Sequence, residues 1–165
     1  MSANVRLRPV VDTDREVLYR CYASTRAEEL SVVDWTDAQK EQFLRMQFHA
    51  QSVHYDKYYP NATFQLILVD DEPAGRLSVD RWAKEIRIVD ITLLPPFRGR
   101  GVGGALLQAL IDESTAAGKP LSIHVEKQNP AMALYRRLGF RAVGEVGVYD
   151  LMERPVESVP TSPTA

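Results

Sequence analysis

Short apolar runs separated by turn residues dominate the hydrophobic pattern of this chain and predict β-strands. The runs either alternate apolar and polar positions or are rich in Val, Ile and Leu. Turns such as Asp70-Asp71-Glu72-Pro73 lie between them, and connections this short join antiparallel strands. We expect seven strands, over residues 5–10, 63–69, 74–82, 85–94, 121–125, 141–145 and 148–152.

Apolar residues spaced three and four apart predict four helices between these strands. Capping side chains mark where three of them begin: Asp12 or Asp14, Thr36 or Asp37, and Asn129. The first helix continues through Cys21 and is followed by a polar segment, the third covers 105–117, and the fourth ends at Leu138. The stripe of the second helix that should face the core is Phe43, Met46, Ala50 and Val53.

The order of these elements, β-α-α-β-β-β-α-β-α-β-β, predicts a mixed α/β sheet in one domain. With 165 residues, the chain is long enough to bury one core. The last stretch, 154–165, contains three prolines and few apolar side chains. We therefore expect a single domain over 1–153, followed by a disordered tail.

Charge and composition narrow the function classes. The formal net charge is −2, so nothing indicates a general attraction to nucleic acid or to an anionic membrane. No apolar run approaches the roughly 18 residues of a membrane helix, and the first residues do not have the pattern of a signal peptide. Cys21 is the only cysteine and no metal-ligand spacing is present, which favours a reducing, cytoplasmic location and no metal site.

A glycine-rich loop over residues 98–104, RGRGVGG, lies between a predicted strand and a predicted helix. Backbone N–H groups of such a loop and the helix N-terminus can hold a pyrophosphate. The loop fits two templates, G-x-G-x-x-G at Gly99, Gly101 and Gly104, and R-x-x-G-x-G at Arg98, Gly101 and Gly103.

The first template is the fingerprint of dinucleotide-binding folds. Glu126 supports it, because it lies about 20 residues downstream, where a ribose hydroxyl would be met. Such folds, however, carry the loop on their first strand and continue through several parallel βαβ units. Here several strands and two helices precede the loop, and too little chain follows Gly104. We therefore reject this interpretation, and a Walker A loop is excluded because no Lys-Ser or Lys-Thr follows the glycines.

The second template fits better. Residues 91–103, ITLLPPFRGRGVG, closely resemble the acyl-CoA-binding motif of the GNAT superfamily of N-acyltransferases. Residues 129–140, NPAMALYRRLGF, are similar to the second signature of that family, N-x-A-x-x-L-Y-x-x-x-G-F. The order of elements from Val5 to about Glu153 also matches. The resemblance implies a mainly antiparallel central sheet of six or seven strands, flanked by about four helices and splayed between the fourth and fifth strands.

The resemblance also assigns residues to acetyl-CoA, the expected co-substrate. The pantetheine arm would pair with the backbone of Ile91 and Leu93, as an added strand does, and a backbone N–H near Leu93 or Leu94 would hold the oxyanion. Asn129 caps a helix by its position, and by resemblance it also lies near the cofactor arm. The pyrophosphate would lie on the loop formed by Arg98, Gly99, Arg100, Gly101, Val102 and Gly103.

Acyl transfer to an amine also needs groups that move protons. By resemblance, Tyr135 contacts the cofactor and is the general acid for the leaving thiolate; the alternative is a tyrosine ring packed in the core. Asp90 is our first candidate for the base, acting through water, and its alternative role is an ion pair with Arg81 or Arg87. Further candidates for the base, each with a structural role as the alternative, are Glu126, His124 and His54.

We expect the acceptor to bind at residues 24–35 and at the end of the second helix. Carboxylates beside aromatic rings can receive a cationic amine. The alternative is a solvated charged turn followed by core aromatics. The candidate side chains are Glu28, Glu29, Asp34, Trp35, His54, Tyr55, Tyr58 and Tyr59.

The sequence thus predicts an acetyl-CoA-dependent N-acetyltransferase that acts on a small-molecule or peptide amine by direct attack in a ternary complex. We expect no nucleic-acid or membrane partner, and the resemblance allows a homodimer. Transfer of a longer acyl group, or transfer to a hydroxyl, is an alternative within the same chemistry. A non-catalytic acyl-CoA sensor or partner domain on the same scaffold is the alternative from another class.

Overall fold

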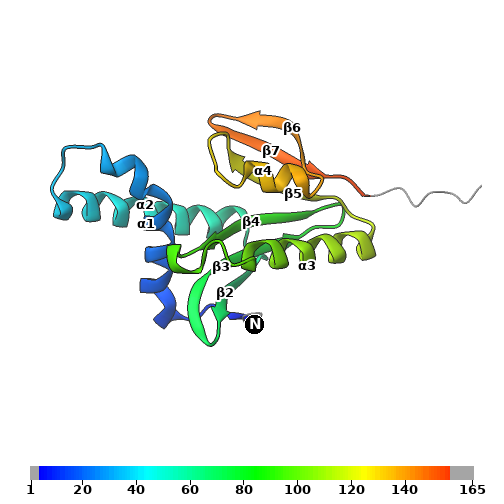
Figure 1. Cartoon of the computed structure of the whole chain (residues 1–165), viewed down its shortest axis with the longest axis horizontal. Helices are drawn as coiled ribbons and strands as arrows, with labels where there is room; N and C mark the ends of the chain where they lie inside the picture. Colours follow the sequence, from blue (N-terminus) through cyan, green and yellow to red (C-terminus); the bar gives the residue numbers. More distant parts are fainter. Residues whose placement is uncertain (1–3, 157–165) are drawn as a thin grey trace, which may run out of the picture. The chain divides into compact units, whose positions relative to one another are not determined.

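The structure, a computed structural model, describes residues 4–156 of the chain (Figure 1). The helical elements are η1 (Asp12–Asp14), α1 (Arg15–Ser31), α2 (Asp37–Tyr58), η2 (Pro95–Phe97), α3 (Val102–Ala117) and α4 (Met132–Arg137). The strands are β1 (Val5–Pro9), β2 (Thr63–Val69), β3 (Glu72–Arg81), β4 (Ile86–Leu93), β5 (Leu121–Glu126), β6 (Arg141–Val146) and β7 (Tyr149–Arg154).

The strands form one seven-stranded sheet in the order β1-β2-β3-β4-β5-β7-β6. The β1–β2, β2–β3, β5–β7 and β6–β7 pairs are antiparallel, and the β4–β5 pair is parallel. The predicted fold class, a mixed and mainly antiparallel sheet with four helices, is therefore confirmed.

The parallel β4–β5 pair is short. Its register covers Ile86–Ile88 against Leu121–Ile123, whereas β4 continues to Leu93 and β5 to Glu126. The predicted splay between the fourth and fifth strands is thus confirmed. Because backbone groups beyond the paired residues need other partners, this splay provides a place where an extended ligand can add to a strand.

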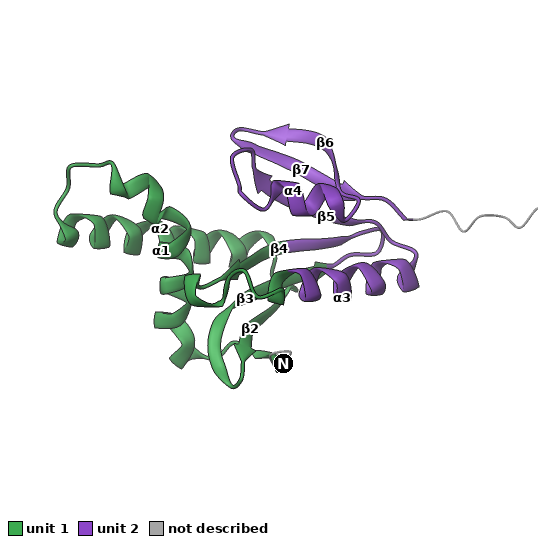
Figure 2. Cartoon of the chain, in the orientation of Figure 1, with its two compact units in different colours: residues 1–80, 89–103 green, residues 81–88, 104–165 purple. Residues whose placement is uncertain are grey.

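The chain divides into two compact units (Figure 2). Unit 1 comprises residues 1–80 and 89–103, and unit 2 comprises 81–88 and 104–165. The loop after β4 and the second half of β4 belong to unit 1, whereas β5, α4 and nearly all of α3 belong to unit 2.

The core of unit 1 contains an aromatic cluster between α1 and α2. Tyr19 and Tyr22 of α1 meet Phe48 of α2, and the Tyr19 and Phe48 rings pack edge to face at 5.9 Å. Leu44, one turn before Phe48, completes the buried face of α2. The predicted stripe is therefore wrong: Phe43 packs at the edge of the cluster, but Met46, Ala50 and Val53 are exposed.

The core of unit 2 is aliphatic. One face of α3 is buried through Leu106, Leu107, Leu110 and Ile111, and β5 buries Leu121, Ile123 and Val125. At the edge of this unit, the Arg81 and Glu113 side chains form an ion pair.

Several element ends differ from the sequence predictions. The first helix runs on to Ser31 through the expected polar segment, and α3 begins at Val102 rather than at 105. Asn129 does not cap α4, which begins at Met132; instead its Oδ1 accepts a hydrogen bond from the Ala131 N–H at 2.8 Å, as in an Asx turn. Arg154, assigned to the tail, is the last residue of β7, and the rest of the predicted tail from residue 157 lies outside the described residues.

Among the described residues, no helix combines the length and the apolar character needed to cross a membrane.

Candidate active site

The glycine loop leads directly into the N-terminus of α3. Gly99 and Gly101 have φ angles of +74° and +80°, a region that L side chains rarely adopt, so another residue at either position would be strained. A Cβ built on either residue meets no atom within 4 Å. The loop backbone is therefore open to an incoming group, and the α3 N-terminus adds partial positive charge. This cradle fits a pyrophosphate.

The two arginines of the loop differ in what they contact. The Arg98 Nε donates to the Leu93 carbonyl at 2.9 Å, and its Nη2 donates to Ser24 Oγ at 3.2 Å. Arg98 therefore fastens the loop to the end of β4 and to α1. Arg100 rests over the Phe97 ring at 5.6 Å and forms no ion pair or hydrogen bond with other described residues. Of the two loop arginines, Arg100 is therefore the one whose guanidinium is available to bind an anion.

The end of β4 presents two of its residues away from β3. The Leu94 N–H donates to the Ala74 carbonyl at 2.7 Å, and the Thr92 carbonyl lies against Gly75 of β3. Backbone groups of successive strand residues point to opposite edges. The backbone groups of Ile91 and Leu93 therefore point to the edge away from β3, as the predicted pairing with a pantetheine arm requires. The sequence offered the N–H groups near Leu93 and Leu94 as candidate donors to the oxyanion. The Leu94 N–H is bonded to Ala74, so Leu93 is the remaining candidate.

Gly75, which the sequence analysis did not select, permits this arrangement. A Cβ at position 75 would lie 2.0 Å from the Thr92 carbonyl oxygen and 3.0 Å from Leu93 Cα. No side chain fits there unless the end of β4 moves. Its sequence signal was a single glycine inside a predicted strand, which marks close approach of another backbone.

Asp90 lies in a polar cluster beneath α1 and α2. Its Oδ2 is 3.4 Å from Arg76 Nε, and its Oδ1 accepts a hydrogen bond from the Thr92 hydroxyl at 2.8 Å. Burial raises the pKa of Asp90 above its ordinary value, against the opposing effects of Arg76 and Thr92. The predicted ion pair with Arg81 or Arg87 is wrong, since the partner is Arg76. A carboxylate with a raised pKa is suited to accept a proton.

Cys21 of α1 faces the same cluster. It is fully buried, and burial raises the pKa of its thiol to about 11. The thiol is therefore protonated at neutral pH and is not a nucleophile.

Tyr135 and Asn129 belong to unit 2. Tyr135 is buried and its ring packs edge to face against Phe140 at 5.6 Å. The ring thus has the structural role that the sequence analysis left open, while its part in catalysis stays a prediction. Asn129 is exposed and holds the turn before α4.

His124 and Glu126, two alternative bases, also lie in unit 2. Arg87 Nη1 lies 3.4 Å from His124 Nδ1, so this nitrogen acts as an acceptor. Burial and the Arg87 charge lower the pKa of His124, which keeps the ring neutral. Tyr149 donates to Glu126 Oε1 at 3.4 Å. These contacts favour the structural role for both residues.

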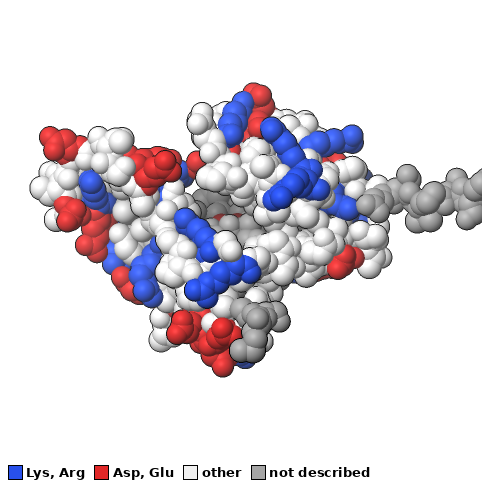
Figure 3. Space-filling view, in the orientation of Figure 1, with Lys and Arg blue, Asp and Glu red and all other residues white. Residues whose placement is uncertain are grey.

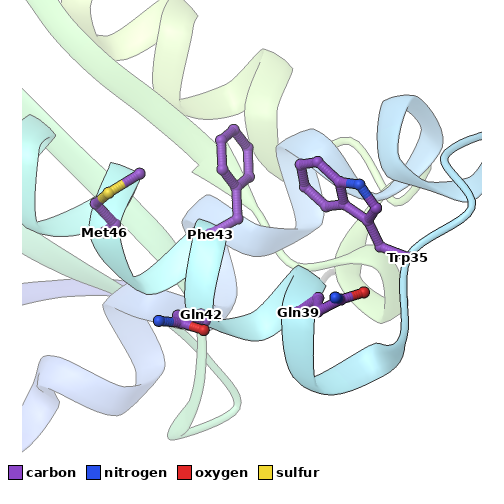
Figure 4. A pocket seen from close by; sticks show the side chains of 5 residues that line it. All are labelled: Trp35, Gln39, Gln42, Phe43 and Met46. Atoms are coloured by element: carbon purple, nitrogen blue, oxygen red, sulfur yellow. The ribbon is translucent and has the colours of Figure 1, made fainter.

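The α1–α2 end of unit 1 carries the features expected of an acceptor region. A cavity of about 320 Å³ is lined by Trp35, Gln39, Gln42, Phe43 and Met46. Trp35 and Phe43 pack edge to face at 5.3 Å, and Trp35, Phe43 and Met46 point to the same side (Figure 4). Figure 3 shows acidic side chains gathered at this end of the molecule, and the exposed carboxylates here include Glu28, Glu29, Asp34 and Asp37.

The end of α2 carries the remaining candidates. His54 lies 4.6 Å from the Tyr58 ring and is also near Tyr55 and Tyr59. His54 and Tyr58 are exposed. Tyr55 and Tyr59 are half-buried, so the cluster extends from the surface toward the interior of unit 1.

Comparison with curated proteins finds acetyltransferases. The chain is 37% identical over 83 residues to a mycothiol acetyltransferase of Catenulispora acidiphila, covering 50% of this chain and 26% of that protein. It is 34% identical over 86 residues to a streptothricin acetyltransferase of Streptomyces lavendulae, covering 50% of this chain and 46% of that protein. The chain thus spans less than half the length of these curated relatives.

Solved structures share the fold. The PaiA N-acetyltransferase of Thermoplasma acidophilum in complex with coenzyme A aligns with a TM-score of 0.69 at 16% identity, covering 92% of this chain and 99% of that one. An acetyltransferase of Thermus thermophilus aligns with a TM-score of 0.65 at 21% identity, covering 93% and 97%. The model of the acetyltransferase (GNAT) family matches residues 25–140, and the chain therefore belongs to this family.

Proposed function

We propose that this protein is an N-acetyltransferase that moves the acetyl group of acetyl-CoA to a primary amine by direct attack in a ternary complex. The observation that carries the proposal is the open glycine loop of Gly99 and Gly101 at the end of a splayed β4, in a chain of this family. Acetyl-CoA supplies an acetyl group activated as a thioester. We infer a cytoplasmic location, where Cys21 stays reduced.

The residues of unit 1 bind and orient in this proposal. Loop N–H groups from Gly99 to Gly103 and the Arg100 guanidinium hold the pyrophosphate. The backbone of Ile91 pairs with the pantetheine arm. At Leu93 the carbonyl accepts from Arg98, and the N–H donates first to the arm and then, as the acetyl group reacts, to the developing oxyanion. Leu94 supports them by fixing β4 to Ala74.

Two side chains move protons. Asp90 accepts the proton of the acceptor amine, through water, because both of its oxygens already have protein partners. Tyr135 donates to the leaving thiolate. A tyrosine has a pKa of about 10 and a thiol of about 8.5, so the donation is uphill by roughly 2 kcal/mol and the role of Tyr135 is modest.

The acceptor class follows from the α1–α2 end. An ammonium is attracted to the carboxylates of Glu28, Glu29 and Asp34, and an organic cation is stabilised by the faces of Trp35 and Phe43. We therefore propose a small-molecule or peptide amine that carries positive charge.

The test is thiol release from acetyl-CoA with a panel of amines: a polyamine, a lysine peptide, a basic peptide with a free N-terminus, and neutral primary amines. The proposal predicts release with at least one cationic amine and an N-acetylated product by mass. Binding of acetyl-CoA without thiol release for any amine would instead support the non-catalytic acyl-CoA sensor. A product acetylated on oxygen would contradict the choice of an amine.

A further inference from the structure

One face of β3 in unit 1 carries polar side chains that are buried. Arg76, Ser78 and Asp80 are 7%, 1% and 6% exposed. They alternate along the strand, and Arg76 and Ser78 pair with Leu66 and Phe64 of β2 in a regular register, so they share one face. Buried polar groups are normally hydrogen-bonded, but the Arg76 Nε and the Ser78 Oγ have no hydrogen-bond partner. This face of β3 therefore has unused hydrogen-bonding capacity.

Arg76 has the largest unused capacity of the three. A guanidinium carries five N–H donors, and Arg76 makes no hydrogen bond with any described residue. Its contacts are the Asp90 carboxylate, 3.4 Å from Nε, and the Tyr55 ring, 5.5 Å from the guanidinium carbon. Arg76 is thus a buried cation whose donors remain available to an acceptor.

A cavity of about 300 Å³ lies against Arg76. Arg15, at the start of α1, lines it too; its guanidinium rests 5.1 Å from the Phe48 ring and forms no ion pair with a described residue. The nearby carboxylate of Asp14 is not available to either cation, because Arg8 holds it with hydrogen bonds of 2.7 and 2.8 Å. Two arginines therefore line one cavity with unused donors.

The remaining lining sets the size and polarity of a ligand. Val11, Leu18 and Phe48 form an apolar wall, and Ser52 lies beside them with its hydroxyl donating to the Phe48 carbonyl at 3.0 Å. Asp12 is the one acidic side chain in the lining. The lining charges of Arg15, Arg76 and Asp12 sum to +1, and Asp90, whose carboxylate lies 3.4 Å from Arg76, offsets part of the Arg76 charge. The cavity therefore suits at most one negative charge and disfavours a polyanion such as a phosphate. The volume is at the low end of the range for ligand pockets.

We propose that this cavity binds an organic monocarboxylate with an apolar body. The carboxylate lies on the guanidinium groups of Arg76 and Arg15, and the apolar body packs on Leu18 and Phe48. Arginine is suited to this because its planar fork matches the two oxygens of a carboxylate. Asp90 and the bound carboxylate would both contact Arg76. Binding of a carboxylate in the cavity would therefore change the electrostatic environment of Asp90, the candidate base.

The binding test uses phenylacetate as the probe and phenylacetamide, its uncharged analogue, as the matched ligand control, titrated into the full chain by calorimetry. We expect phenylacetate to bind with a Kd of about 1–10 mM and phenylacetamide to bind at least about tenfold more weakly. Arg76→Gln should abolish binding. Arg15→Gln changes an exposed side chain that forms no ion pair with a described residue, and it should weaken binding about tenfold. Arg20→Gln, an exposed arginine of α1 outside the cavity, is the control variant.

Equal binding of phenylacetate and phenylacetamide would overturn the proposal, as would no saturable binding of phenylacetate. Unchanged binding in Arg15→Gln would also overturn it. These experiments measure binding and not catalysis. Their results therefore test the carboxylate site independently of the proposed acetyltransferase activity.

A second measurement identifies where the carboxylate comes from, and this step alone rests on the proposed function. Thiol release from acetyl-CoA is compared for L-phenylalanine and for phenethylamine, which lacks the carboxylate. If the carboxylate belongs to the acceptor, phenylalanine is preferred and Arg15→Gln removes the preference. If it belongs to a separate effector, phenylacetate binds but the two amines do not differ. Failure of both amines with phenylacetate still bound would affect only the proposed function.

Discussion

Each unit of this protein buries one arginine on the central strands, and the two arginines differ in how many hydrogen bonds they form. Arg87 in unit 2 is 9% exposed and Arg76 in unit 1 is 7% exposed. The Arg87 Nε donates to Ser122 Oγ at 2.8 Å, and its Nη2 and Nη1 lie 3.4 Å from Glu85 and His124. Arg76 has a carboxylate nearby but no hydrogen bond.

The difference separates structural from functional use of the same residue type. Arg87 also rests over the Trp82 ring at 4.9 Å, so its charge and donors are used within unit 2. A satisfied buried network rigidifies a fold, whereas an unsatisfied buried group calls for a ligand or water. The candidate base, the carboxylate cavity and the glycine loop all lie in unit 1, which also contains the arginine that is not satisfied.

The largest expected effect concerns Asp90, the partner of Arg76. Asp90→Asn should lower kcat/KM by about a hundredfold or more, because it removes the proton acceptor and keeps the shape. Burial raises the Asp90 pKa in the folded state. This group therefore favours the folded state at low pH and loses that contribution as pH rises through its folded pKa, so the variant should melt no lower than the wild type at pH 7.

The pH profile provides the check on Asp90. In the wild type, kcat/KM should fall on the acidic side at a pH above the ordinary range of an aspartate, and this limb should vanish in Asp90→Asn. An unchanged acidic limb would assign the base to another group.

The two arginines should also differ in stability. Arg87→Met should lower the free energy of unfolding by about 2–3 kcal/mol, because the Glu85 carboxylate and the Ser122 hydroxyl, which bond each other, lose the guanidinium that contacts both. Arg76→Met should cost less, about 1 kcal/mol, because no hydrogen bond is lost and Asp90, whose pKa burial already raises, can take up a proton when its ion-pair partner is removed. Urea unfolding of both variants measures these losses in the free energy of unfolding. A larger loss for Arg76→Met than for Arg87→Met would contradict the distinction between the two arginines.

Gly75 tests the end of β4 in unit 1. Gly75→Ala should destabilise the fold by about 1–3 kcal/mol through overpacking against the Thr92 carbonyl. It should also weaken acetyl-CoA binding about tenfold, because β4 must shift. Gly144→Ala in β6 is the matched control, since a Cβ there meets only Leu151 Cβ at an ordinary 3.9 Å. Equal acetyl-CoA affinity in the two variants would remove β4 from the proposed site.

The smallest effect is expected in unit 2. Tyr135→Phe should lower kcat about tenfold and leave the affinity for acetyl-CoA unchanged, because a thiolate can leave without a strong acid. Tyr149→Phe, in the same unit, serves as the control. A loss of a thousandfold or more in Tyr135→Phe would make this tyrosine as important as Asp90.

Local patterns explain which parts of the structure were predictable. The order of the elements follows from short-range periodicity and turn residues, and the glycine loop follows from positive φ angles that glycine adopts without strain. The capping box of Thr36 and Gln39 is local too, and α2 begins as expected at Asp37.

The errors arose where packing decides the outcome. The stripe of α2 was placed one residue away from Leu44 and Phe48, a rotation of about 100°, because the face is selected by Tyr19 and Tyr22 of α1. Arg76, Ser78 and Asp80 alternate as on a solvated strand face, but all three are buried, an outcome that depends on tertiary packing and not on the local pattern. The partner of Asp90 was missed for the same reason.

The most direct test of the central claim, that the loop of unit 1 holds acetyl-CoA, is the melting temperature of three proteins titrated with acetyl-CoA, with NAD as the ligand control. At about a hundredfold excess over Kd the ligand adds about 2.7 kcal/mol, which is roughly 5–11 °C for a chain of this size. The wild type and Gly104→Ala, whose glycine has ordinary φ and open space, should both show this rise. Gly101→Ala, strained at a φ of +80°, should lose it. A rise with NAD, or an equal rise in Gly101→Ala, would contradict the account.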